Sequence, residues 1–97
     1  MFYELMPRYD TRQSFYKKAI VEEKEFKTRK STQYNLYSYN TLVAMVNKYE
    51  NKIVYNYFGK YSQTTTRHQK EFFKQFDLSD KEIKELFKNG KLQKEVL

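Results

Sequence analysis

The fold is decided around the stretch Tyr61-Ser-Gln-Thr-Thr-Thr-Arg-His-Gln-Lys-Glu-Phe-Phe73, where a hydroxyl-rich turn runs into an amphipathic pattern. The apolar positions recur at i, i+4, i+5 and i+8, which is one stripe of an α-helix formed by His68, Phe72, Phe73 and Phe76. The hydroxyl of Ser62 or Thr64 can accept hydrogen bonds from first-turn amides. We therefore predict a helix over residues 62–76.

A second helix is indicated by the capping box Ser79-Asp-Lys-Glu82, in which the serine and glutamate side chains bind backbone amides reciprocally. Leu78 before the box and Ile83 after it have the placement of a hydrophobic staple. Asn89-Gly90 is a good stop, because glycine adopts the left-handed cap conformation without a side-chain penalty. These signals predict a helix over residues 80–89.

The first 58 residues show the alternation of strands instead. The segments rich in aromatic and β-branched residues are Phe15–Glu22, Gln33–Tyr39, Thr41–Val46 and Lys52–Phe58. Asn40 lies between the middle two segments and tolerates turn dihedrals, whereas the charged stretch Glu23–Ser31 is typical of a hairpin loop or of a solvated extension of the flanking strands. We predict a meander of three or four antiparallel strands over residues 15–58.

Together these elements predict one α+β domain, because a chain of 97 residues supports a single small core. Its expected order is an N-terminal segment over residues 1–14, the sheet, the two helices, and a tail over residues 91–97 that docks through Leu92 or frays. A domain of this size leaves little room for an enclosed active site.

The chain is strongly basic, with 19 Lys and Arg residues against 12 Asp and Glu residues and a formal net charge of +7. Such an imbalance attracts polyanions. The candidate partners are therefore nucleic acid, a nucleoprotein, an acidic protein face or an anionic membrane surface, and the alternative is that the charge serves solubility alone.

Composition also bears on the compartment. No cysteine is present, which removes disulfides and thiolate chemistry and favours a reducing environment. The apolar run Leu42–Val46 is too short to span a bilayer, and residues 1–7 lack the basic start and apolar core of a signal peptide. We expect a cytoplasmic protein that is not embedded in a membrane.

Catalytic chemistry has few candidates. His68 is the only histidine, and with Glu71 nearby it supplies too few ligands for a metal. The simpler role is a packed histidine with one ring nitrogen bonded to a hydroxyl such as that of Thr64. The hydroxyls of residues 62–66 have no orienting acid and are better explained as caps, and the two glycines are isolated, so no phosphate loop is present. We predict no enzyme activity, no metal and no cofactor.

Two surfaces are candidates for partner binding. Three cations at positions 67, 70 and 74 share one side of the predicted first helix. Two tyrosines at positions 55 and 57 share a face of the last predicted strand, where their rings either stack on bases or pack against the helices. With two further lysines, the predicted partner-binding residues are Arg67, Lys70, Lys74, Tyr55, Tyr57, Lys60 and Lys84.

Three blocks of the sequence are similar to a known family. They are Tyr9-Asp-Thr-Arg-Gln-Ser-Phe-Tyr-Lys-Lys-Ala19, Leu36-Tyr-Ser-Tyr-Asn-Thr-Leu-Val-Ala44 and Tyr61-Ser-Gln-Thr-Thr-Thr-Arg-His-Gln-Lys-Glu-Phe72. They resemble blocks in a family of small uncharacterised domains encoded by phages and other mobile elements of Firmicutes. The resemblance implies a sheet followed by a helix and a mobile-element context, and the residues after Asp77 lie outside it.

This context and the basic charge favour a small accessory protein that acts by binding. Its most specific form is an inhibitor of a host nucleic-acid-targeting defence complex, such as a CRISPR effector. The alternatives are a non-catalytic nucleic-acid-binding phage protein and a self-associating interaction module. Salt distinguishes direct binding to nucleic acid, because affinity that depends on phosphate contacts falls steeply as salt rises.

Overall fold

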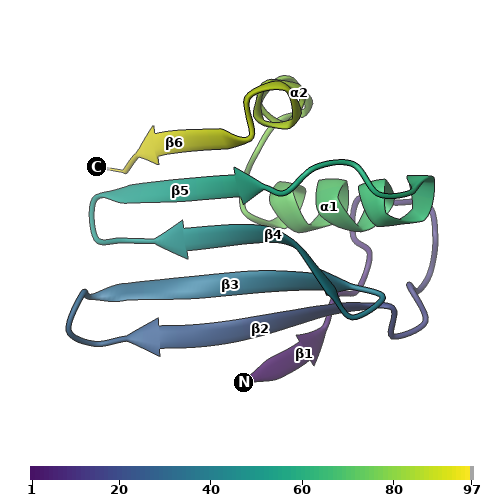
Figure 1. Cartoon of the computed structure of the whole chain (residues 1–97), viewed down its shortest axis with the longest axis horizontal. Coiled ribbons are helices and arrows are strands. Elements are labelled where there is room, and N and C mark those ends of the chain that lie inside the picture. Colours follow the sequence, from purple (N-terminus) through teal and green to yellow (C-terminus); the bar gives the residue numbers. More distant parts are fainter. Residues whose placement is uncertain (97) are drawn as a thin grey trace.

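The protein is an α+β domain, seen in a computed structural model that describes residues 1–96 (Figure 1). The strands are β1 (Phe2–Glu4), β2 (Ala19–Phe26), β3 (Ser31–Ser38), β4 (Thr41–Lys48), β5 (Lys52–Tyr57) and β6 (Lys91–Glu95). The helices are α1 (Gln63–Gln75) and α2 (Asp80–Asn89).

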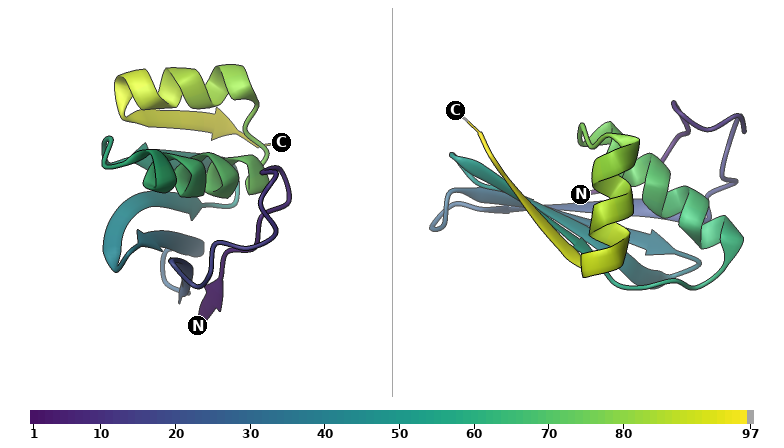
Figure 2. Two further views of the ribbon diagram at one scale, coloured as in Figure 1. Left: turned by 90° about the vertical axis from the view of Figure 1, so that its right-hand side faces the viewer. Right: turned by 90° about the horizontal axis from the view of Figure 1, so that it is seen from above.

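The strands form one antiparallel sheet in which the order in space is the order in the chain, from β1 to β6. Both helices belong to the connection between β5 and β6 and lie on the same side of the sheet (Figure 2). α1 packs on β3 and β4, and α2 packs on β5 and β6. Residues 5–18, called the N-terminal arm below, join β1 to β2 near α1.

The core lies between this face of the sheet and the helices. Val21, Leu36 and Ala44 stand opposite one another on β2, β3 and β4, and none of them has exposed surface. Phe72 and Phe73 of α1 are buried against this layer just as fully. The strand alternation and the helical stripe read from the sequence therefore meet in a single core, as burial of apolar surface requires.

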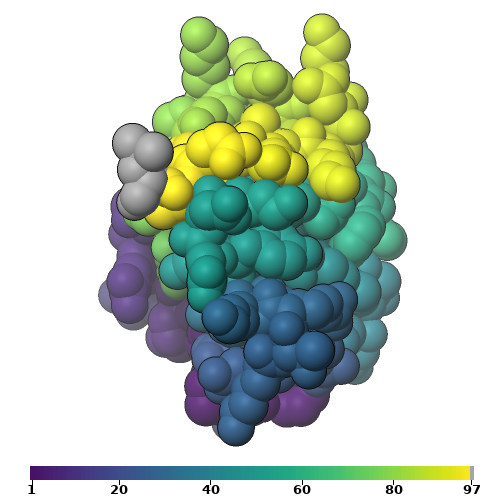
Figure 3. Space-filling model, turned by 90° about the vertical axis from the view of Figure 1, so that its left-hand side faces the viewer, coloured from purple at the N-terminus to yellow at the C-terminus, as the bar shows by residue number. Residues whose placement is uncertain are grey.

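The opposite face of the sheet mixes polar side chains with apolar ones, since Ile20 stands opposite Tyr37 and Met45 opposite Asn35. On it Asn35 Nδ2 and Tyr37 Oη both donate to Glu22 Oε1, at 3.2 and 3.1 Å. These hydrogen bonds hold the pKa of Glu22 below its usual range, the bond from Asn35 being the largest cause. Figure 3 shows the end of the molecule where the β2–β3 and β4–β5 hairpins turn, with β6 beside them. That end is remote from the start of α1 (Figure 1).

The predicted α+β class and the order of sheet before helices are confirmed, but the predicted strand count was too low, since the sheet has six strands. β6 falls in the predicted tail, where Leu92 pairs with Tyr55 of β5. β1 falls in the predicted N-terminal segment and pairs with β2. Both are short edge strands whose hydrogen bonds connect residues distant in the chain, so neither has a strong local signal.

The first predicted strand was placed too early. Residues 15–18 form a tight turn, in which Lys18 N donates to Phe15 O at 3.0 Å, and β2 begins at Ala19. The charged stretch after Glu22 is an extension of the strands, the second of the two alternatives, because Glu23, Lys24 and Glu25 continue the pairing with β3. Alternating charged residues suit a strand whose outer part is exposed.

Both helices were predicted closely, because their signals are local. Ser62 is the N-cap of α1, with its Oγ accepting from Thr65 N at 3.1 Å. The capping box of α2 is present, with both reciprocal bonds between Ser79 and Glu82. Gly90 ends α2 at φ 81°, the left-handed conformation expected of it.

Candidate functional site

Glu71 fixes the N-terminal arm to α1. Its side chain is 2% exposed, and its two carboxylate oxygens accept the backbone N–H groups of Arg8, Tyr9 and Asp10 at 2.9–3.0 Å. A buried carboxylate is stable only when its oxygens are hydrogen-bonded in this way. From the sequence, Glu71 was considered only as a metal ligand. In the structure it is the residue that holds the arm against α1.

Two left-handed turns lie side by side next to the start of α1. Tyr16 and Lys17 have φ of 54° and 62°, and Tyr39 and Asn40, between β3 and β4, have φ of 50° and 69°. Tyr39 N donates to Lys18 O at 2.9 Å and so joins the two turns. Positive φ is unfavourable for tyrosine, and such strained residues cluster at functional sites.

The two turns and the first part of α1 enclose a pocket of about 220 Å³. We call it the aromatic–basic pocket, and it is lined by Arg12, Ser14, Phe15, Tyr16, Lys18, Tyr39, Thr64, Arg67 and His68. Its rim carries two exposed rings, since Tyr16 is 74% and Tyr39 51% exposed. The pocket therefore combines accessible aromatic surface with cationic side chains.

His68 is the inner wall of the aromatic–basic pocket. Its ring centroid lies 4.6 Å from that of Phe15 and 5.9 Å from that of Tyr39, with the Tyr39 ring stacked. Its Nδ1 is 2.8 Å from Ser38 Oγ, which is itself 2.8 Å from Thr65 Oγ1. The predicted packed histidine bonded to a hydroxyl is confirmed, but the hydroxyl belongs to Ser38 rather than Thr64.

Counting donors assigns the proton on His68. If Thr65 donates to Ser38 and Ser38 donates to Nδ1, both hydroxyl protons have acceptors, whereas the reverse order leaves the Thr65 proton without one in this cluster. Nδ1 is then the acceptor and Nε2 carries the proton. Burial, the largest cause, lowers the pKa of His68, and Arg12 adds to this while Asp10 opposes it, so the neutral ring is favoured.

The cations of the pocket differ in how far they are neutralised. Arg67 Nη1 forms an ion pair with Asp10 Oδ1 at 3.2 Å. Within residues 1–96 neither Arg12 nor Lys18 belongs to an ion pair, and both are exposed. Lys18 Nζ lies 6.0 Å from the centroid of the Tyr39 ring. Arg12 and Lys18 are thus free to meet an anion without losing a carboxylate partner.

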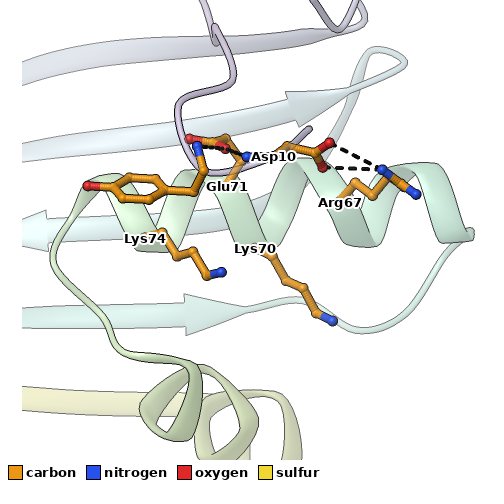
Figure 4. A pocket seen from close by; sticks show the side chains of 6 residues that line it. Asp10, Arg67, Lys70, Glu71 and Lys74 are labelled. Carbon is orange, nitrogen blue, oxygen red and sulfur yellow. Dashed lines mark hydrogen bonds and ion pairs between the residues drawn. The ribbon is translucent and has the colours of Figure 1, made fainter. Parts of the chain in front are cut away.

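A second hollow of about 260 Å³ runs along α1 and shares Arg67 with the pocket (Figure 4). We call it the helix groove, and it is lined by Tyr9, Asp10, Arg67, Lys70, Glu71 and Lys74. In Figure 4 the Arg67 side chain reaches Asp10, while Lys70 and Lys74 extend away from it. Lys74 Nζ is 3.0 Å from Asp80 Oδ1, and Lys70 forms no ion pair within residues 1–96.

The predicted site residues fall into two groups. Arg67, Lys70 and Lys74 do line one groove, although two of them are paired with carboxylates. The prediction of an exposed tyrosine surface on β5 was wrong. Tyr55 has no exposed surface and donates its hydroxyl to Phe76 O at 2.8 Å, and Tyr57 stacks on Phe87 of α2 with centroids 4.1 Å apart.

The tyrosines of β5 are covered because both point to the face on which the helices pack, the structural alternative weighed above. Burial, reinforced by Asp77 and Glu82, raises the pKa of Tyr55 to about 12. Lys60 and Lys84 are exposed but line neither the aromatic–basic pocket nor the helix groove. These four predicted residues are therefore not part of the candidate site.

Most of the pocket residues that the predicted site omitted lie outside the helices and strands of the structure, the exceptions being Thr64 and His68 of α1. Arg12, Tyr16 and Lys18 lie in the arm, and Tyr39 lies in a turn. A signal was nevertheless present, because all nine lining residues belong to the three sequence blocks quoted above, residues 9–19, 36–44 and 61–72. Three blocks distant in the chain meet at one pocket.

The comparisons identify a family. A family of unknown function (DUF8033) has a model that matches residues 3–89, so the chain belongs to this family. No curated protein and no solved structure matches the chain. Within residues 1–96, no helix combines the length and apolar character needed to cross a membrane, and no group of three or more His, Cys, Asp or Glu side chains is placed to hold a metal ion.

Proposed function

We propose that this protein acts by binding single-stranded nucleic acid at the aromatic–basic pocket and along the helix groove. The observation that carries the proposal is the presence, at one end of the sheet, of exposed tyrosine rings beside Arg12 and Lys18, which form no ion pair within residues 1–96. Rings of this kind stack on bases and cations neutralise phosphates, which is the combination that proteins use to hold single strands.

Binding rather than catalysis is supported by the state of Ser38. Its Oγ lies within hydrogen-bond reach of His68, as in a nucleophile and base pair, but the side chain is 1% exposed and also contacts Thr65. Both hydrogen bonds of that hydroxyl lie in the core, so the oxygen is engaged by Thr65 and His68 rather than presented to a substrate. With Nδ1 accepting from Ser38, the proton of His68 is on Nε2.

The proposal is tested by measuring the affinity of a fluorescent single-stranded oligonucleotide over a salt series. For the wild-type protein we expect log Kd to rise linearly with log salt, with a slope of about 0.7 per phosphate contacted. The double variant Arg12→Glu/Lys18→Glu is expected to weaken binding at least about tenfold at low salt and to reduce the slope.

A matched control is offered by the β2–β3 hairpin, at the other end of the sheet (Figure 1). Arg29→Glu/Lys27→Glu reverses one arginine and one lysine, as the test variant does, so net charge changes equally. Both control side chains are exposed, and their reversal should leave most of the affinity. Equal weakening by the two variants would show that net charge alone governs binding and would contradict the proposed site.

The inhibitory role predicted from the sequence is proposed for the same surface. A protein that occupies a guide or target strand, or the basic channel that holds it, blocks a nucleic-acid-targeting complex without chemistry. Affinity purification with the wild-type chain and with Arg12→Glu/Lys18→Glu as bait tests this role. Recovery of a nucleoprotein complex by the wild type alone supports it, and recovery of no complex by either bait contradicts it.

A further inference from the structure

We infer that the aromatic–basic pocket receives one unstacked nucleobase of the bound strand and that His68 Nε2–H recognises it through an acceptor atom on the base edge. The inference rests on the proposed function and names what the pocket reads. It predicts base preference, which phosphate contacts alone do not provide.

The size and walls of the pocket fit a single base. Its volume of about 220 Å³ is below the roughly 300–1,000 Å³ of sites for drug-sized ligands. Its rim presents the exposed rings of Tyr16 and Tyr39, and its inner wall is formed by Phe15 and His68. Flat apolar walls around a small space favour a planar ring, which is the usual way that an unpaired base is held.

His68 gives the pocket a fixed hydrogen-bond donor. Because Nδ1 accepts from Ser38, the proton is on Nε2, the nitrogen directed away from that bond. His68 is only 1% exposed, but Nε2 is not fully sealed, since the one buried side-chain nitrogen or oxygen without a partner among residues 1–96 is Gln69 Oε1, and the ring lines the pocket. A hydrogen-bond donor inside an aromatic pocket favours a base with a carbonyl oxygen at that position and disfavours one with an amino group.

The entrance provides for the phosphates on either side of the base. Arg12 and Lys18 are exposed and unpaired within residues 1–96, and Arg67 connects the pocket to the helix groove. Lys18 Nζ is 6.0 Å from the Tyr39 centroid, at the outer limit of a cation–π contact, so the side chain can turn to a phosphate at little cost. With one base in the pocket, the phosphate backbone of the bound strand would therefore lie among these cations.

The donor predicts which base is preferred. Thymine and uracil present the carbonyl oxygen O4 where cytosine presents an amino group, and thymine differs further only by its C5 methyl group. A donor facing a donor leaves both unsatisfied in a desolvated site. We expect oligo(dT) to bind at least about fivefold more tightly than oligo(dC) of equal length.

The test measures binding of oligo(dT) and oligo(dC) by fluorescence anisotropy for the wild type and three variants. Tyr39→Asn removes a rim ring and keeps a residue that tolerates positive φ, and it should weaken oligo(dT) binding roughly tenfold. His68→Gln should bring the two oligonucleotides to nearly equal affinity. Tyr61→Ala is the ring control, because Tyr61 is 52% exposed and lines neither hollow. Thermal melting verifies that each variant is folded.

Each outcome decides the inference. Preference for oligo(dT) that is lost in His68→Gln, with weakening by Tyr39→Asn and not by Tyr61→Ala, supports it. Equal binding of both oligonucleotides, unaffected by Tyr39→Asn but weakened by Arg12→Glu/Lys18→Glu, overturns the base pocket and leaves the proposed function standing. Failure of every oligonucleotide to bind at low salt overturns both, as does displacement of oligo(dT) by poly-glutamate of equal charge at the same concentration.

Discussion

At the scale of single residues, His68 links stability to the candidate site. Its ring packs between Phe15 and Tyr39 while Nδ1 accepts from Ser38, so the folded protein favours the neutral form. Burial lowers its pKa from the ordinary value of 6.5, an effect opposed by the nearby Asp10. Protonation would place a charge in this packed position and remove the acceptor that Ser38 uses.

A pH dependence of stability follows. Because the pKa of His68 is lower in the folded than in the unfolded chain, the unfolded chain binds more protons at mildly acidic pH, and stability falls as pH drops below about 6.5. Melting temperatures between about pH 7.5 and 5.5 should therefore decline for the wild type and stay flatter for His68→Gln. An identical decline in both proteins would assign the effect to other groups.

At the scale of elements, the N-terminal arm depends on one side chain of α1. Glu71 accepts three backbone N–H groups of the arm, and Gln75 Nε2 donates to it at 2.6 Å. The arm supplies Arg12, Tyr16 and Lys18 to the pocket, although Glu71 bonds to the arm at Arg8, Tyr9 and Asp10 instead. The carboxylate therefore positions the site from a distance.

Replacing this carboxylate by an amide should loosen the arm. Glu71→Gln keeps the size of the side chain but loses the charge and half of its acceptor capacity, so we expect a loss of about 2 kcal/mol of stability, measured by chemical denaturation. Oligonucleotide affinity should fall as well, because the arm carries two of the pocket's cations. Glu85→Gln is the control, since Glu85 is exposed on α2 and should tolerate the same change.

Unchanged stability and affinity for Glu71→Gln would show that the arm is held mainly by apolar contacts such as those of Leu5 and Phe15, which are 1% and 4% exposed. The comparison with Glu85→Gln separates the loss of the hydrogen bonds from the loss of charge, because both variants remove one negative charge from a helix.

The elements also show what the sequence can reveal. The capping box at Ser79 and the glycine at position 90 act within a few residues, so α2 was predictable to its ends. β6 was not predictable, because Leu92 is the only apolar residue of its five. The strand is formed by its pairing with β5, which no local pattern reveals. The arm forms no helix or strand, although residues 15–18 were assigned to a strand from the sequence. Its order comes from hydrogen bonds to a carboxylate 61 to 63 residues away, so most of the pocket could not be placed from local patterns.

At the scale of the whole molecule, the two ends of the sheet differ in the side chains that they expose. One end carries the hairpin turns and the other carries the arm, the β3–β4 turn and the start of α1 (Figures 1 and 3). The formal charge of +7 is shared by the whole surface. What distinguishes the second end is the exposed rings of Tyr16 and Tyr39 beside Arg12 and Lys18, which form no ion pair within residues 1–96. In the proposed function, long-range attraction brings a polyanion near and these side chains hold it.

The most direct test of the account is a heteronuclear NMR titration of the protein with oligo(dT), which reports on every backbone amide at once. We predict that chemical-shift changes concentrate on residues 12–18, 38–40 and 64–70, with little change in the β2–β3 hairpin around residues 27–30. Changes that centre on that hairpin or on the face of the sheet opposite the helices, or no saturable change at low salt, would contradict the account.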